Sequence, residues 1–240
     1  MQIALIGYGK MGKMIEQVAL ERGHEIILKI NEENKEAFTL NNMAKADVAI
    51  EFTAPASAFE NVRKCIDFGV PVISGSTGWN QQLDEAKRFC IERSSAMLHA
   101  SNFSIGVNIF FEINALLAKL MSSQNAYEPM LKEVHHTQKL DAPSGTAVTL
   151  AEQILAHLPG KTNWVNVTSS DPSALTIISE RTDPAPGTHH VKYSSEIDDI
   201  EIIHTAHNRK GFALGAVLAA EFIQGKKGVF SMKEVLGLRS

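Results

Sequence analysis

The first hundred residues alternate between two hydrophobic patterns. An unbroken apolar run from Gln2 to Gly7 is typical of a buried strand, and apolar residues at helical spacing follow from Met11 to Arg22. The alternation continues, and it predicts strands at Glu25 to Ile30, Val48 to Phe52, Val70 to Ser74 and Ala96 to Ala100, with helices at Ala56 to Phe68 and Asn80 to Ser94. Repeated strand–helix–strand units predict an α/β domain built on a doubly wound parallel sheet.

The pattern changes after Asn102. A helix from about Asn108 to Met121 leads into a region that is rich in strands and contains one helix near Thr146 to His157. The predicted strands are Tyr127 to Thr137, Trp164 to Thr168, Ala174 to Arg181, Thr188 to Ser194 and Ile200 to Thr205. This clustering predicts a second, α+β domain with an open sheet, antiparallel or mixed. An apolar helix from Gly211 to Gln224 is expected to return to the first domain.

Charge and cysteine content narrow the function classes. A net charge of -4 over 240 residues argues against nucleic acid or an anionic membrane as the main partner, so a few placed groups must hold any bound anion. Two cysteines without metal-type spacing suit a reducing cytosol. A strand begins almost at Met1, and the apolar tract from Phe212 to Ile223 is too short to cross a bilayer. We therefore predict a cytoplasmic protein with no membrane partner.

A glycine-rich loop follows the first strand. The segment from Gly7 to Gly12 has the spacing G-x-G-x-x-G and opens a helix, which is the context of a dinucleotide-binding loop. The first glycine permits a tight turn, the second lets the backbone approach a pyrophosphate, and the third lets helix and strand pack closely. The predicted cofactor-binding residues here are Gly7, Tyr8, Gly9, Lys10, Met11 and Gly12. The alternative is a merely tight strand–helix turn.

The second strand ends without the acidic residue that usually holds the adenosine ribose. Asn31 stands there and can hydrogen-bond a ribose without repelling a 2′-phosphate, while Lys29 or Lys35 is either a phosphate partner or solvated surface. The choice between NADH and NADPH stays open. Two later loops at the carboxyl ends of strands are candidates for contacts with the nicotinamide end, or else ordinary turns: Gly75, Ser76 and Thr77, and Ala100, Ser101, Asn102 and Phe103.

The segment from Glu133 to Ala147 is the richest in chemistry. Neighbouring strand residues face opposite sides, so one of His135 and His136 can act as an acid while the other braces the site or binds substrate. Ser144, Gly145 and Thr146 open a helix whose N–H groups form an anion site, and Lys139 adds a positive charge on the same loop. Together they are suited to grip a carboxylate. The alternative is a pair of polar strand residues followed by an ordinary helix start.

Arg209 lies between the last strand and the terminal helix and can pair with a second carboxylate, although such a residue is often only a surface charge. Metal binding is not predicted. The pairs His189–His190 and His204/His207 sit on presumed strands without carboxylates at ligand spacing, and no HExxH motif occurs. A serine hydrolase is not favoured either, because G-x-S-x-G is absent.

Over essentially its full length, the chain resembles the dihydrodipicolinate reductase family. The match is carried by the segment from Glu133 to Ala147, by the glycine loop, by Glu51-Phe52-Thr53, by the loop from Gly75 to Gly78 and by Asn102 to Asn108. Many members of the family carry one more residue in the glycine loop and an acidic residue where Asn31 stands. Many also have Gly-Thr-Thr where this chain reads Gly75-Ser76-Thr77.

The resemblance implies a Rossmann domain formed by residues 1–105 together with 210–240. This domain binds NADH or NADPH, and Phe52 and Thr53 are implied to contact the cofactor in addition to the loops named above. Residues 106–209 are the implied substrate domain, whose sheet builds a homotetramer. The implied reaction is the reduction of 4-hydroxy-tetrahydrodipicolinate, a small cyclic dicarboxylate, in diaminopimelate and lysine biosynthesis. His135 takes the acid role and Lys139 assists or binds substrate, while His136, Gly145, Thr146 and Arg209 hold the dicarboxylate. Closure of the two domains is expected.

Two alternatives stay open from the residues alone. One is another two-domain, nicotinamide-dependent amino-acid or semialdehyde dehydrogenase. The other is a dinucleotide sensor without turnover. The cluster of Lys139 with residues 144–146, together with Arg209, favours a dicarboxylate over the first, and the paired histidines favour chemistry over the second.

Overall fold

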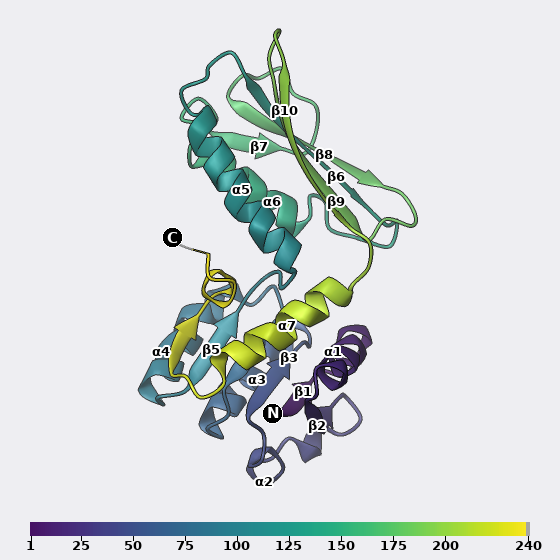
Figure 1. The fold of residues 1–240 in the computed structure, drawn as a ribbon, viewed down its shortest axis with the longest axis vertical. Coiled ribbons are helices and arrows are strands. Elements are labelled where there is room, and N and C mark those ends of the chain that lie inside the picture. The colour runs from purple at the N-terminus through teal and green to yellow at the C-terminus, as the bar shows by residue number, and fades with distance from the viewer. Residues whose placement is uncertain (239–240) are drawn as a thin grey trace. The chain divides into compact units, whose positions relative to one another are not determined.

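The computed structural model describes residues 1–238 and divides into two compact units. Unit 1 runs from Met1 to Ile105 and resumes at Arg209, and unit 2 runs from Gly106 to Asn208. Figure 1 shows the chain leaving unit 1 after β5 and returning to it through α7. The boundary differs from the expected one by a single residue, Arg209, which belongs to unit 1.

Unit 1 is built on a six-stranded sheet in the order β11-β5-β4-β3-β1-β2, and all five strand pairs are parallel. The strands are β1 (Gln2–Ile6), β2 (Glu25–Ile30), β3 (Val48–Glu51), β4 (Val72–Ser74), β5 (Ala96–His99) and β11 (Gly228–Phe230). The helices are α1 (Lys10–Glu21), α2 (Leu40–Met43), α3 (Pro55–Asp67), α4 (Leu83–Glu92), α7 (Lys210–Ile223) and α8 (Met232–Val235). Short 3-10 turns occur at Lys35–Ala37 and Asn80–Gln82.

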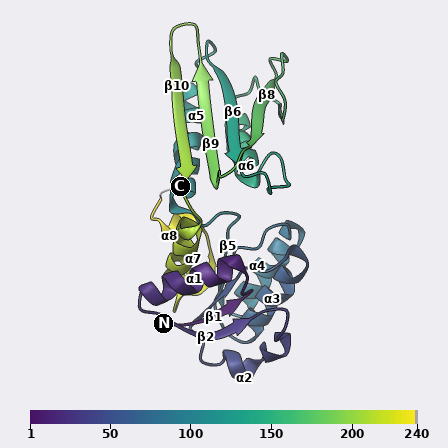
Figure 2. The same ribbon diagram turned by 90° about the vertical axis from the view of Figure 1, so that its right-hand side faces the viewer.

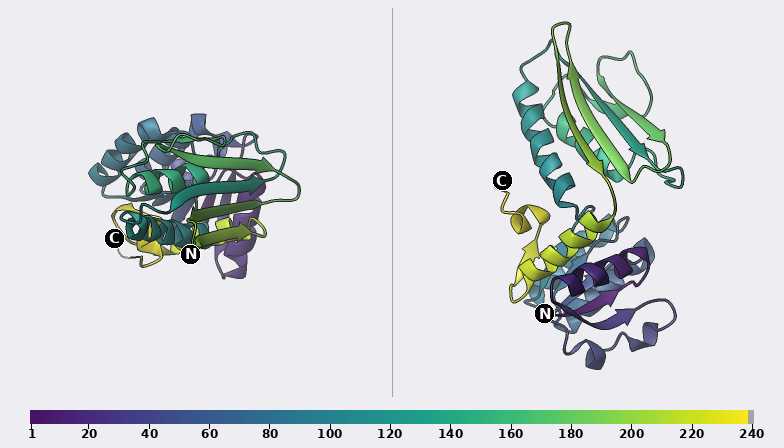
Figure 3. Two further views of the ribbon diagram at one scale, coloured as in Figure 1. Left: turned by 90° about the horizontal axis from the view of Figure 1, so that it is seen from above. Right: turned by 45° about the vertical axis from the view of Figure 1, so that its right-hand side comes forward.

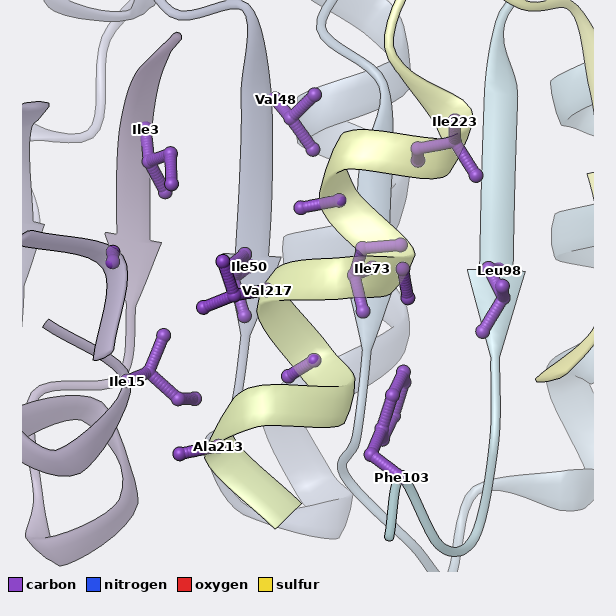
Figure 4. Packing of buried hydrophobic residues seen from close by; sticks show 14 of the residues in the cluster. Ile3, Ile15, Val48, Ile50, Ile73, Leu98, Phe103, Ala213, Val217 and Ile223 are labelled. Atoms are coloured by element: carbon purple, nitrogen blue, oxygen red, sulfur yellow. The ribbon is translucent and has the colours of Figure 1, made fainter. Parts of the chain in front are cut away.

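Both faces of this sheet are covered because alternate strand residues point to opposite sides. Ile3 and Leu5 of β1 pack with residues of α1 and α7, and Ala4 and Ile6 pack with residues of α3 and α4. Figure 4 shows Val217 and Ile223 of α7 among the strand residues Ile50 and Leu98, and Ala213 on the side of Ile15 of α1. The expected return of the last apolar helix to the first domain is therefore confirmed, and so is the doubly wound parallel sheet.

Unit 2 carries a five-stranded mixed sheet in the order β10-β9-β6-β8-β7. The pairs β10–β9 and β9–β6 are antiparallel, and β6–β8 and β8–β7 are parallel. Figure 2 shows β10, β9, β6 and β8 side by side. The strands are β6 (Glu128–His135), β7 (Asn163–Val165), β8 (Ala174–Arg181), β9 (Gly187–Ser194) and β10 (Asp199–Ala206). The prediction of an open sheet, antiparallel or mixed, is confirmed in its mixed form.

Two helices cover one face of that sheet, α5 (Ile105–Met121) and α6 (Gly145–Leu155). Figure 3 shows both on the same side. Their buried residues, such as Phe110 and Leu150, form one core with Leu131, Ile177 and Val191 of the strands. Within the described residues, no helix combines the length and the apolar character needed to cross a membrane.

The sequence did not predict β11, α2 or α8. β11 adds a sixth strand beside β5, with Val229 opposite Met97. It is only three residues long and follows Lys226 and Lys227, so it lacks the apolar run that marked the other strands.

Candidate functional site

The loop between β1 and α1 needs glycine at its three positions for different physical reasons. Gly7 has φ +99°, and a Cβ there would lie 2.0 Å from the carbonyl oxygen of Phe52. A Cβ at Gly12 would lie 2.3 Å from the carbonyl oxygen of Gly7, so helix and strand approach too closely for any side chain. A Cβ at Gly9 would meet nothing within 4 Å. The open space at Gly9, in front of the α1 N-terminus, fits the close approach of a pyrophosphate.

A cavity of about 1070 Å³ lies beside this loop within unit 1. Its lining includes four groups that the sequence predicted for a dinucleotide: the glycine loop, Asn31, Phe52 and Thr53. The cavity thus extends from the loop toward the end of β2, where the adenosine ribose of a dinucleotide is held in this fold. The residues present fit a dinucleotide. Lys10 and Met11 lie in the first turn of α1, the former exposed and the latter partly buried.

Asn31 forms a small hydrogen-bonded turn at the end of β2. Its Oδ1 accepts from the backbone N–H of Glu33 at 2.9 Å and of Asn34 at 3.2 Å, and its own N–H donates to Oδ1 of Asn34 at 2.8 Å. The side-chain oxygen is therefore engaged by the protein, so the amide NH₂ is the group that Asn31 can offer to a ligand in the cavity. A donor at this position suits a ribose oxygen or a phosphate oxygen.

The two lysines considered for a 2′-phosphate already have acidic partners. Lys29 pairs with Glu16 of α1 at 2.5 Å and lies over the ring of Tyr8, 5.0 Å from its centroid. Lys35 lines the cavity and pairs with Glu32. A 2′-phosphate at Lys35 would have to displace Glu32, an exposed partner whose loss costs little.

A buried carboxylate joins the two loops that follow β3 and β4. Glu51 is fully buried at the end of β3. Its Oε1 accepts from the Thr53 N–H at 2.9 Å and the Ser76 hydroxyl at 2.7 Å, its Oε2 accepts from the Ser74 hydroxyl at 2.6 Å, and the Thr53 hydroxyl also donates to it. Charge-assisted bonds of this kind are the stronger ones, so Glu51 holds Thr53 and Ser76 in fixed positions.

The remaining predicted cofactor residues differ in exposure. Thr77 and Ser101 are exposed, and Asn102 accepts from the Ser104 N–H through Oδ1 at 2.9 Å. Gly75 and Ala100 are partly buried, and a Cβ at Gly75 would lie 2.2 Å from the Phe52 ring. Phe103 is only 2 % exposed and packs in the core under α7 (Figure 4). A side-chain contact between Phe103 and a cofactor does not fit this burial, so that residue can contribute only its backbone.

In unit 2, the carboxylate of Glu133 lies at the centre of a polar cluster on β6 and its neighbouring strands. Its Oε1 accepts from the Ser144 N–H at 3.0 Å and the Ser179 hydroxyl at 2.8 Å, and lies 3.3 Å from the guanidinium of Arg181. Burial raises the pKa of the Glu133 carboxyl, but the neighbouring His135 imidazole and hydrogen bonds from Ser144 and Ser179 outweigh it and hold the pKa well below its usual range. Glu133 is therefore a buried anion.

Two histidines face the other oxygen of this carboxylate. Nδ1 of His135 lies 3.4 Å from Oε2, and Nε2 of His189 lies 3.7 Å from it. The two rings meet edge to face with centroids 5.1 Å apart. Burial and the neighbouring charge of His135 lower the pKa of His189 to about 3, so that imidazole is neutral near pH 7.

Ser144 caps α6 as predicted, but it is buried. Its Oγ accepts from the Ala147 N–H at 3.2 Å and lies 3.2 Å from Nε2 of His189, while its own N–H donates to Glu133. Its hydrogen-bonding groups thus hold the cluster together. The exposed Gly145 follows in the first turn of the helix, with Thr146 beside it, and these two stand at the mouth of the expected anion site.

Lys139, His136 and Arg209 complete the predicted set. Lys139 lies in the loop after β6 and pairs with Asp141 at 2.8 Å. His136 follows the end of β6 and is less buried than His135, as the alternation of a strand requires. Arg209 is exposed and belongs to unit 1, so its part in binding the dicarboxylate stays a prediction.

By distance alone, Glu133, His135 and His189 can each direct one atom at a metal ion, because these atoms lie within 4.8 Å of one another. The expectation that no carboxylate supports His189 was wrong, since Glu133 lies directly opposite it across the β6–β9 pair. Arg181 and the serine donors nevertheless already compensate the Glu133 charge. We therefore interpret the trio as a buried carboxylate flanked by two histidines rather than a set of metal ligands.

Comparisons with known proteins agree with both halves of the chain. The family model "Dihydrodipicolinate reductase, N-terminus" matches residues 1–103, and "Dihydrodipicolinate reductase, C-terminus" matches residues 106–236. The chain belongs to the dihydrodipicolinate reductase family. The resemblance inferred from its motifs is thereby confirmed.

Curated relatives of this reductase family cover most of the chain. The 4-hydroxy-tetrahydrodipicolinate reductase of Christiangramia forsetii is 47% identical over 98% of both chains. That of Neisseria gonorrhoeae is 34% identical over 82% of this chain and 75% of its own length. A solved dihydrodipicolinate reductase from Paenisporosarcina, with bound dipicolinate, has a TM-score of 0.79 at 22% identity and covers 97% of this chain and 98% of its own, which supports the fold.

Another solved structure shares the fold more loosely. An aspartate semialdehyde dehydrogenase from Vibrio cholerae has a TM-score of 0.56 at 13% identity, covering 92% of this chain and 97% of its own. Likeness at this level concerns architecture alone, as expected for a two-domain dehydrogenase fold that hosts several activities.

Sequence reasoning missed several residues of these two clusters, among them Glu51, Glu133 as the partner of His135, and His189. For Glu51 the signal was its place at the end of an apolar strand, and for Glu133 it was its place on the same strand face as Leu131, because a buried carboxylate must be paired. His189 gave no such signal, since only the pairing of β9 with β6 brings it to Glu133.

Proposed function

We propose that the protein is an NAD(P)H-dependent reductase that converts 4-hydroxy-tetrahydrodipicolinate to tetrahydrodipicolinate with loss of water, a step toward diaminopimelate and lysine. Membership of the reductase family supports the reaction. The observation that carries it is the cluster at the end of β6. There a buried, ionised Glu133 faces His135 next to the N-terminus of α6, in the same segment as Lys139.

The substrate is a dicarboxylate, and two features of unit 2 suit one of its carboxylates. The first turn of α6 at Gly145 and Thr146 offers the positive end of a helix dipole. Lys139 supplies a cation whose partner, Asp141, is exposed, so a substrate carboxylate can replace Asp141 at small cost. We assign the second carboxylate to Arg209, and a contact with the ring substituents to His136.

His135 is the proposed acid. When bound at the Gly7–Gly12 loop, NADH or NADPH supplies the hydride that reduces the dehydrated ring. The ring must also gain one proton, and the Nε2–H of His135 gives it, leaving the electron pair of that bond on the nitrogen. A positioned acid of this kind typically contributes ~10²–10⁴-fold to the rate. In unit 1, Glu51 holds Thr53, which lines the cofactor cavity, and it also accepts a hydrogen bond from Ser76 in the next loop.

The proposed assembly is a cytoplasmic homotetramer formed through the sheet of unit 2. Two exposed isoleucines, Ile200 and Ile203, support it, because they lie on β10 at the edge of that sheet. Exposed apolar residues on an edge strand invite pairing with another chain. Light scattering on the purified protein should give four times the mass of one chain, and a monomer would refute the assembly.

A coupled assay tests the reaction. Substrate generated freshly by a synthase is added to purified protein, and the absorbance of the reduced cofactor is followed with NADH and NADPH separately. Oxidation that depends on the fresh substrate supports the proposal and reports cofactor preference. Cofactor binding without oxidation would refute it, and would favour either a related dehydrogenase or a sensor without turnover.

A further inference from the structure

The buried carboxylate of Glu133 has one oxygen that the protein's own hydrogen bonds do not use. Three groups engage Oε1: the Ser144 N–H, the Ser179 hydroxyl and the Arg181 guanidinium. Among the described residues, neither Oε2 of Glu133 nor Nδ1 of His135 has another hydrogen-bond partner. They lie 3.4 Å apart. In proteins without bound substrate, catalytic hydrogen bonds are often long in this way and tighten when substrate binds.

Strand geometry fixes this pair. Glu133 and His135 are two residues apart on β6, so their side chains leave the same face of the strand. In the sheet, β9 places His189 opposite Glu133, and β8 places Arg181 opposite His135. The carboxylate is therefore surrounded by groups from β6, β8 and β9 and by Ser144, the N-cap residue of α6.

Burying an anion costs free energy, and well-packed apolar residues in its place often give equal or greater stability. A buried carboxylate such as that of Glu133 therefore points to a role other than stability. The Ser144 N–H, the Ser179 hydroxyl and the Arg181 guanidinium lower this cost by donating hydrogen bonds to Oε1 of Glu133. His189, which faces the same oxygen from β9, is neutral, and His204 and Lys139 oppose its protonation. The positive charge that can form closest to Oε2 is therefore that of His135.

We propose that Glu133 is a positioning residue that accepts the Nδ1–H of His135 and thereby directs Nε2, with its transferable proton, toward the substrate. The inference rests on the proposed function, in which His135 is the acid. The carboxylate does not take the proton. It fixes the tautomer and ring orientation and stabilises the imidazolium before transfer.

The opposite edge of the imidazole supports this assignment. A Cβ at Gly187 would lie 3.1 Å from Nε2 of His135 and 3.3 Å from its Cδ2. Gly187 also has φ +156°, which side-chain-bearing residues rarely adopt. The glycine therefore keeps the Nε2 edge uncrowded while Nδ1 faces the buried carboxylate. A side chain here would fill space on the side from which a substrate must approach.

The test compares Glu133→Gln and Glu133→Asp with Glu180→Gln as the control. Glu180 is an exposed glutamate on β8 that pairs with Lys132, so it tests the loss of a charge from the same sheet. We expect Glu133→Gln to lower kcat by about 10²-fold or more, because a wrongly oriented acid loses most of its contribution. KM and the cofactor Kd should change less than about threefold. Glu133→Asp keeps the charge and should recover part of kcat, and Glu180→Gln should match the unchanged protein.

A spectroscopic measurement on the unaltered protein does not depend on how the variants fold. In ¹⁵N histidine spectra, His135 should carry its proton on Nδ1 when neutral, and Glu133→Gln should shift the population toward the Nε2–H tautomer. A neutral His135 protonated at Nε2 in the unaltered protein would overturn the inference, as would an unchanged kcat in a folded Glu133→Gln protein. Failure of the unaltered protein to turn over substrate refutes the proposed function instead, and leaves the tautomer result standing.

Discussion

Substitution by alanine should have different effects at Gly9 and Gly12 of the dinucleotide loop: it should weaken cofactor binding at Gly9 and lower stability at Gly12. In Gly12→Ala the new methyl would lie 2.3 Å from the Gly7 carbonyl oxygen, about 1 Å closer than an ordinary contact. Because that oxygen is backbone, strand and helix must move apart. Overpacking of this kind costs about 1–3 kcal/mol, and the better helix propensity of alanine returns up to about 1 kcal/mol. The free energy of unfolding should fall by about 1–2 kcal/mol.

Gly9→Ala places its methyl where no protein atom lies within 4 Å. Gly9 has a negative φ of -85° and a ψ of -152°, at the edge of the extended region, so alanine does not have to adopt the left-handed backbone. Stability should therefore stay within about 0.5 kcal/mol of the unchanged protein or rise slightly. The methyl does occupy the space proposed for the pyrophosphate. Loss of close backbone approach should raise the cofactor Kd by about 10–100-fold, which corresponds to about 1.4–2.7 kcal/mol.

Urea unfolding and titration of NADH fluorescence on both variants separate the two effects. The expected result is a stable Gly9→Ala protein that binds cofactor poorly, beside a destabilised Gly12→Ala protein. Equal destabilisation of both, with cofactor affinity unchanged in Gly9→Ala, would show that the space in front of α1 does not receive the pyrophosphate.

Four further outcomes are expected. His135→Gln should lower kcat by ~10²–10⁴-fold with the cofactor Kd unchanged, and a variant with full turnover would remove its acid role. Asn31→Asp should weaken NADPH at least about tenfold relative to NADH, because a carboxylate repels the 2′-phosphate; equal effects on both Kd values would place the phosphate elsewhere. Glu51→Gln leaves a hydroxyl donor without an acceptor and should lower the free energy of unfolding by about 2 kcal/mol, measured by urea unfolding. The pKa of His189 is lowered to about 3 in the folded protein from about 6.5 in the unfolded chain, so its stabilising contribution is complete above pH 6.5 and is lost as the pH falls toward 3. The free energy of unfolding should therefore decrease by up to about 1.4 kcal/mol per pH unit over this range, and His189→Gln should show a flatter dependence on pH.

Long hydrophobic patterns predicted most of the fold. β2 and β8 have the bounds that the sequence indicated, because each is built around a mostly apolar run, Ile26 to Leu28 in β2 and Ala174 to Ile178 in β8. The terminal helix was placed correctly from its apolar run and is now seen as α7. β11 was missed because three residues carry too little pattern, and its place is decided by pairing with β5, over 130 residues earlier in the chain.

Motif position predicts where a loop lies better than which way its side chains point. Phe103 follows β5 at the edge of the sheet where cofactors bind, and it was therefore assigned to the cofactor. Its ring instead packs in the core against Phe52, and its carbonyl oxygen lies so close to Gly215 that a Cβ there would be 1.7 Å away. Only the packing of α7 on the strands decides this direction, and that contact joins segments about 110 residues apart.

The cluster around Glu133 shows the same limit for chemistry. Alternation along β6 already implied that Glu133 and His135 share a face, so this pair was within reach of the sequence. His189 was set aside because no carboxylate stood near it along the chain. Across an antiparallel pair, however, the residue directly opposite is a neighbour whatever its sequence separation, and Glu133 is that residue. The number of residues between two candidate ligands or proton-transfer groups is therefore informative when both lie in one helix or loop. In a sheet it becomes informative only once the register is known, and here the register turns an apparently unsupported histidine into part of the proposed acid site.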